Sequence, residues 1–120
     1  MALVVPWPPV PATAAFRRTL KQLAATSALS WQESVSSDTS RSAPISVTLH
    51  DPGPRFLASE VYGDGSGLHP FQLPAPAGQI RFAFAVGGAI HVEMTTDQRG
   101  RLLAEQLTTP NHLIVRTFAP

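Results

Sequence analysis

Hydrophobic and polar residues alternate along the segments 45–50, 79–94 and 112–118. A period of two residues predicts β-strands with one buried and one solvent-facing side, because successive side chains of a strand point to opposite faces. In the last segment, Ile114 and Arg116 fall on the same side of the strand. These three segments predict that the second half of the chain is built mainly from antiparallel strands.

The segment Gln79–Met94 is divided by Gly87-Gly88 and predicts a β-hairpin. A two-residue turn would mix apolar and polar side chains on both faces, so we favour a three-residue loop, Val86-Gly87-Gly88, with Gly88 in the left-handed conformation. This register pairs Ile80 with Met94, Phe82 with Val92, Phe84 with Ile90, Arg81 with Glu93 and Ala83 with His91.

The period changes to that of a helix from Thr13 to about Thr26. Thr13 is the expected N-cap. The apolar stripe consists of Phe16, Leu20, Leu23 and Ser27. Arg17, Arg18 and Lys21 lie away from that stripe, and we interpret them as the solvated face of an amphipathic helix rather than as a phosphate site.

The remaining segments are less regular. We expect short strands at 31–35 and 56–62 and an irregular, extended crossing at 68–78, which contains three prolines. The segment 97–107 fits either a helix or a turn followed by a strand. Gly100 favours the strand. Inside a helix a glycine costs about 1 kcal/mol relative to alanine, whereas at the end of a turn it can adopt the positive φ that the turn requires.

Residues 1–11 form a separate, uncharged stretch with four prolines, which predicts an extended arm. Its apolar side chains are costly to leave in water, so we expect the arm to pack on its own domain or on a neighbouring subunit. The candidate partner-binding residues are Val4, Val5, Trp7 and Val10. Residues 12–120 are expected to form a single β-rich domain.

Composition excludes several classes of site. The 120 residues contain no cysteine and carry a net charge of +1, so there is no thiolate metal site and no charge imbalance typical of nucleic-acid binding. No apolar run reaches the ~18–20 residues of a transmembrane helix, so we expect a soluble protein. The arm lacks the basic start of a secretory signal, whereas an organelle-import peptide stays an alternative because the first acidic residue is Glu33.

Candidate chemistry is sparse. The four histidines, His50, His69, His91 and His112, lie in no recognised motif. His91 and Glu93 would project from one face of a strand and are the candidate pair for a metal ion, but an ion pair between Glu93 and Arg81 explains them as well. We interpret Gly63–Gly67 as a flexible connection rather than a nucleophile elbow or phosphate loop.

The sequence therefore predicts an α+β, β-rich fold, with an N-terminal helix packed on an antiparallel sheet, a sandwich or a small open barrel of six or seven strands. We expect no cofactor and no enzymatic activity, but a structural or protein-interaction subunit of a larger assembly, such as a particle or a homo- or hetero-oligomer. A small metal-assisted or ligand-binding enzyme using His91 and Glu93 is the alternative. A second alternative is a single-stranded nucleic-acid-binding barrel that stacks bases on aromatic residues, namely Tyr62, Phe71, Phe82 and Phe84.

Overall fold

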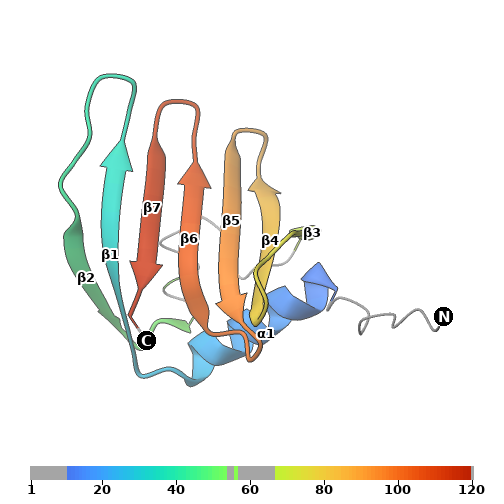
Figure 1. The fold of residues 1–120 in the computed structure, drawn as a ribbon. Helices are drawn as coiled ribbons and strands as arrows, with labels where there is room; N and C mark the ends of the chain where they lie inside the picture. The colour runs from blue at the N-terminus through green and yellow to red at the C-terminus, as the bar shows by residue number, and fades with distance from the viewer. Residues whose placement is uncertain (1–10, 54–55, 57–66, 120) are drawn as a thin grey trace.

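The computed structural model describes residues 11–53, 56 and 67–119. The elements whose bounds it gives are, in chain order, α1 (Ala12–Ala25), β1 (Ala28–Ser36), β2 (Ile45–His50), β3 (Phe71–Leu73), β4 (Gln79–Val86), β5 (Ile90–Asp97), β6 (Leu102–Thr108) and β7 (Leu113–Phe118). The predicted helix and the β-rich α+β class are confirmed (Figure 1).

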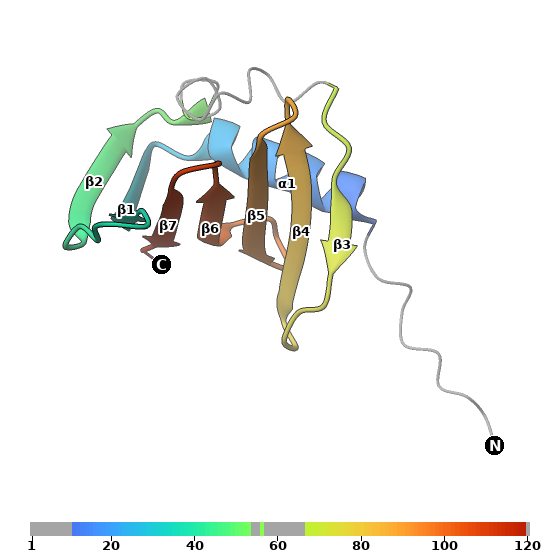
Figure 2. The same cartoon turned by 90° about the horizontal axis from the view of Figure 1, so that it is seen from above.

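The seven strands form one antiparallel sheet in the order β2-β1-β7-β6-β5-β4-β3. The sheet is open, with β2 and β3 at its two edges, so it is not closed into a barrel. Helix α1 lies across one face of the sheet and contacts β3 and β4 (Figures 1 and 2). Strand β1 is placed between β2 and β7, so the first and last of the described strands are neighbours.

Helix α1 begins one residue before the predicted N-cap. Pro11 occupies the N-cap position and its carbonyl accepts a hydrogen bond from the Ala15 amide at 2.9 Å, whereas Thr13 lies inside the first turn. Proline suits the start of a helix because its φ is already close to the helical value and it has no amide hydrogen to satisfy. Thr19 is fully buried on the sheet side, and its hydroxyl donates to the Ala15 carbonyl at 3.1 Å.

The β4–β5 hairpin is confirmed, but its predicted register is wrong by two residues. Phe82 lies opposite Met94 and Val86 lies opposite Ile90, so the loop is Gly87-Gly88-Ala89. The residue with positive φ, at 60°, is Gly87 and not Gly88. A shift of two residues leaves every side chain on the predicted face, which is why the apolar pattern did not discriminate between the two registers.

The turn between β5 and β6 confirms the strand that Gly100 favoured. The Gly100 amide donates to the Asp97 carbonyl at 3.1 Å, and Gly100 has a φ of 92°. A Cβ atom at this position would lie 2.7 Å from the backbone carbon of Arg18 in α1. Glycine is therefore required both by the backbone conformation and by the close approach of the helix.

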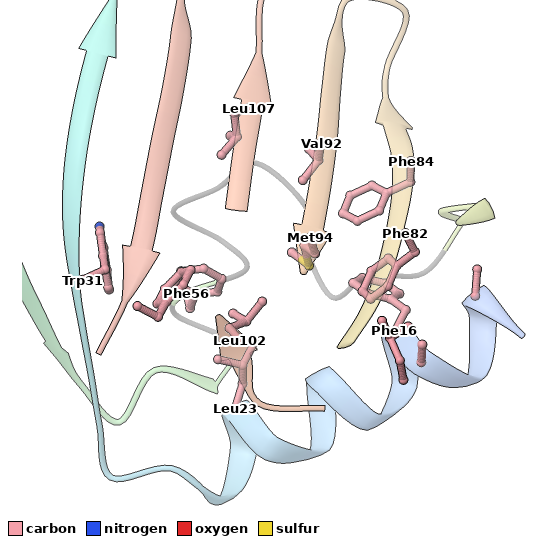
Figure 3. Close-up of a cluster of buried hydrophobic side chains, with 14 residues drawn as sticks. Phe16, Leu23, Trp31, Phe56, Phe82, Phe84, Val92, Met94, Leu102 and Leu107 are labelled. Carbon is pink, nitrogen blue, oxygen red and sulfur yellow. The ribbon is translucent and has the colours of Figure 1, made fainter. Parts of the chain in front are cut away.

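The core contains two aromatic clusters (Figure 3). At one end, Phe16 of α1 packs against Phe82 and Phe84, with ring centroids 5.7 and 5.1 Å apart. At the other, Trp31 packs against Phe118 at 5.6 Å and against Phe56 at 5.9 Å. Apolar side chains from β5, β6 and the end of α1, namely Leu23, Val92, Met94, Leu102 and Leu107, complete this core.

The irregular segments differ in part from expectation. Strand β1 is longer than the predicted 31–35, and the Pro-rich crossing contains the short strand β3. Phe56, where a strand was expected to begin, has helical backbone, and its amide donates to the Pro52 carbonyl at 2.7 Å. The rest of that predicted strand, residues 57–62, lies outside the described residues, as do residues 1–10 of the predicted arm.

Candidate functional site

His91 and Glu93 share one face of β5, opposite Ala85 and Ala83 of β4. Oε2 of Glu93 accepts a hydrogen bond from Nη2 of Arg81 at 3.0 Å, and this guanidinium also donates to the Pro74 carbonyl at 3.0 Å. The predicted ion pair is thus confirmed, although the two residues are diagonal neighbours rather than directly opposite. Glu93 is engaged with Arg81, which leaves His91 as the remaining candidate ligand of the pair.

The four histidines are exposed and come from separate parts of the fold. His50 ends β2, His69 precedes β3, His91 lies near the start of β5 and His112 precedes β7. Among the residues that the structure describes, no three His, Cys, Asp or Glu side chains are grouped so that they could hold a metal ion. The described residues therefore supply no third ligand to the pair singled out by the sequence.

A row of charged side chains crosses the core face of the sheet, and sequence reasoning missed it. Strand pairing places Arg116 of β7 directly between Glu33 of β1 and Glu105 of β6. Nε of Arg116 donates to Oε1 of Glu33 at 2.5 Å, and Nη1 donates to Oε1 of Glu105 at 2.9 Å. The guanidinium also lies 5.5 Å from the ring centroid of Trp31, whose Nε1 donates to Glu33 at 3.3 Å. We call these three charged residues the ionic row.

The ionic row is largely removed from water. The side chain of Glu105 is 0% exposed, that of Arg116 10% and that of Glu33 18%. An arginine stays protonated at any physiological pH, so Arg116 can hold carboxylates but cannot transfer a proton to a substrate. The arrangement is typical of a structural network, in which one guanidinium stabilises the two carboxylates beside it.

One signal of the ionic row was visible in the sequence. The alternation of segment 112–118 placed Arg116 on the same side as Ile114, which proved to be the core side. A charged residue in an apolar row requires a partner, but Glu33 lies 83 residues away, and only the order of the strands brings the two together.

The two edge strands expose apolar side chains. Ile45 of β2 is 56% exposed and Phe71 of β3 is 58% exposed, and these are the large hydrophobic residues that stand out at the described surface. Ile45 is paired with Glu33 and so belongs to the core face, whereas Phe71 is paired with Ala83 on the opposite face. The open sheet therefore presents apolar surface at both edges.

Of the aromatic residues suggested to stack bases, Phe71 is exposed, Phe82 and Phe84 are buried, and Tyr62 lies outside the described residues. Phe82 and Phe84 are 0% and 1% exposed, so they cannot stack bases without unfolding the core. Residues 63–66 of the glycine-rich segment lie outside the described residues. So do the four arm residues proposed to bind a partner, Val4, Val5, Trp7 and Val10.

Comparison of the sequence with models of protein families and with curated proteins found no match. In the described part of the chain, no helix has the length and apolar character needed to cross a bilayer. The fold and its residues are therefore the basis on which a function can be proposed.

Proposed function

We propose that this protein is a non-catalytic structural or protein-interaction subunit of a larger assembly, joined to its neighbours through strand β2. The proposal rests on the composition and the exposure of this edge strand. Its six residues, Ile-Ser-Val-Thr-Leu-His, include no acidic residue, lysine, arginine or proline, and its first side chain is more than half exposed.

Edge strands of stable monomers usually carry charges or prolines, since an unprotected edge offers free backbone groups to another strand. The opposite edge shows such protection. Strand β3 is three residues long and lies between Pro70 and Pro74, so it offers few backbone groups for pairing. Strand β2 is the edge better suited to accept a further strand, with Ile45 as an apolar contact for the added chain.

The apolar arm provides a second proposed contact. Val4, Val5, Trp7 and Val10 form an uncharged, proline-rich stretch of the kind that gains free energy when it packs on another surface. Contact through both β2 and the arm would account for the low proportion of charged residues, 14%, in the chain as a whole.

The test is the mass of the full chain, measured by light scattering as a function of concentration. We expect a mass above the 12.8 kDa of one chain, and we expect Ile45→Lys to return it toward 12.8 kDa, because a charge on the edge opposes strand addition. Phe71→Lys is the matched control, since it places the same charge on the protected edge. Circular dichroism establishes that both variants keep the fold.

Deletion of residues 2–10, which keeps the helix N-cap Pro11, tests the arm separately and is expected to weaken the assembly. A wild-type chain that stays at 12.8 kDa at every concentration and also purifies without a partner from its native source would contradict the proposal.

A further inference from the structure

Helix α1 and the β5–β6 turn, which meet at Arg18, both carry exposed cations. They are Arg17, Arg18 and Lys21 on the helix and Arg99 and Arg101 at the turn, and we call these five residues the basic patch. The whole chain contains nine Lys and Arg residues, so more than half of its cationic side chains gather at this junction.

Two observations place the turn against the helix at Arg18. Nη1 of Arg18 donates to the Gln98 carbonyl at 3.3 Å, across 80 residues of sequence. The turn lies so close to the helix that a Cβ on Gly100 would be 2.7 Å from the Arg18 backbone. The helical cations, which the sequence alone presents as an ordinary solvated face, are therefore extended by two arginines from a distant turn.

The positive charge of the basic patch is mostly uncompensated. Asp97 is the carboxylate of the turn, and it accepts the backbone amides of Arg99 at 2.8 Å and Arg101 at 3.0 Å besides pairing with the Arg101 guanidinium at 3.3 Å. Five cations and one carboxylate leave an excess of four positive charges. Arg17, Lys21 and Arg99 form no salt bridge with any residue that the structure describes.

Helix α1 retains this charge at a cost to its own stability. Its sequence contains no acidic residue, so Arg17 and Lys21 repel each other one turn apart without a compensating ion pair. Stability alone would favour a surface on which positive and negative side chains alternate. A cluster of like charges without ion pairs is therefore expected where the surface binds a partner of opposite charge.

A cavity of about 420 Å³ opens beside the basic patch. The residues that line it are Gln22, Gly78, Asp97, Gln98, Arg99 and Arg101. Glutamine amides both donate and accept hydrogen bonds, so they match the backbone N–H and C=O groups of a peptide.

We infer that the basic patch binds an acidic segment of a partner protein, with the guanidinium groups pairing to carboxylates and the two glutamines to the peptide backbone. This rests on the proposed role as an interaction subunit and names the chemistry of a partner. Arginine suits carboxylates because its planar donors bind both oxygens at once. A nucleic-acid strand is less well matched, because the basic patch contains no aromatic side chain on which a base could stack.

Fluorescence polarisation with a labelled ten-residue oligo-glutamate peptide tests the inference on the full chain. We expect binding that weakens with salt, because exposed charges are screened. The combined variant Arg17→Gln, Lys21→Gln and Arg99→Gln should bind about tenfold more weakly, as expected for the loss of three exposed charge contacts. Arg41→Gln is the matched control, since Arg41 is an exposed cation between β1 and β2 and should leave binding unchanged.

Three results would overturn the inference: no binding of oligo-glutamate at low salt, an equal loss in Arg41→Gln, or tighter binding of oligo-thymidylate or of phosphatidylserine vesicles than of the peptide. The variants of the basic patch leave β2 intact, and Ile45→Lys leaves the basic patch intact. If the chain binds the peptide but stays at the mass of a monomer, the β2 contact is wrong and the basic patch holds. If it assembles but does not bind the peptide, the reverse is true.

Discussion

A single row of side chains crosses the core face of the sheet, and its two halves are stabilised by different forces. From β4 to β5 it consists of Phe82 and Met94, both fully buried. From β6 through β7 to β1 it consists of Glu105, Arg116 and Glu33. The apolar half is stabilised by burial and packing. In the ionic half, the attraction between the charges has to offset the free energy that it costs to remove them from water.

The two halves should therefore respond differently to substitution. An apolar core loses stability in proportion to the volume removed. A buried ionic network is sensitive to the loss of one member, because that loss leaves another charge without compensation, and tolerant of the replacement of all members together.

The largest effect is expected from Phe82→Ala. This substitution removes a fully buried ring that contacts Phe16 and Phe84, and it should lower the free energy of unfolding by about 4 kcal/mol. Urea denaturation followed by circular dichroism measures the change. Gln72→Ala is the control, since Gln72 is the exposed cross-strand neighbour of Phe82, and a comparable loss there would contradict the assignment of Phe82 to the core.

Arg116→Met should lower the free energy of unfolding by about 3 kcal/mol, although methionine keeps much of the volume. The cause is the Glu105 carboxylate, which would stay buried without its guanidinium. Urea denaturation followed by circular dichroism measures this change in the free energy of unfolding. A loss below about 1 kcal/mol, the value typical of exposed pairs, would show that water reaches the ionic row.

Gly100→Ala should cost about 2 kcal/mol, since alanine must adopt a positive φ and its Cβ must displace the Arg18 backbone. Gly88→Ala is the matched control, because a Cβ there meets nothing within 4 Å. Thermal and urea unfolding of the two variants compare them directly. Equal stability would contradict the close approach of the turn to α1.

The smallest effect is expected when the ionic row is replaced as a unit by Glu33→Gln, Glu105→Leu and Arg116→Met. The glutamine introduced in place of Glu33 would keep an acceptor for Nε1 of Trp31, and the two apolar side chains would remove the buried charges. The free energy of unfolding should lie within about 1 kcal/mol of the wild type, well above that of Arg116→Met alone. A triple variant as unstable as the single one would show that the row stabilises the fold through its shape rather than its charge.

Much of the fold could be predicted because its signals are local. The alternation in segments 45–50 and 112–118 identified strands, and Gly100 correctly favoured a turn over a helix. The hairpin register could not be settled in this way, because registers that differ by two residues bury the same side chains. Strand β3 was missed because three residues between prolines carry too little pattern.

The candidate sites depended on distant contacts and were correspondingly harder to foresee. The ionic row requires the pairing of β1 with β7, and the basic patch requires the β5–β6 turn to reach α1. The Arg81–Glu93 pair was predictable because it lies within one hairpin, where neighbours in space are also close in sequence.

The placement of β1 beside β7 has a consequence for the order of folding. The hairpin of β1 and β2 precedes the other described strands in the chain, but it joins the sheet through β7, which follows all of them. Until then Trp31 lacks Phe118 and Glu33 lacks Arg116. Such long-range pairing is expected to slow the final step of folding, and until β7 arrives the edge of β1 that it will cover stays unpaired and open to a strand from a neighbouring chain.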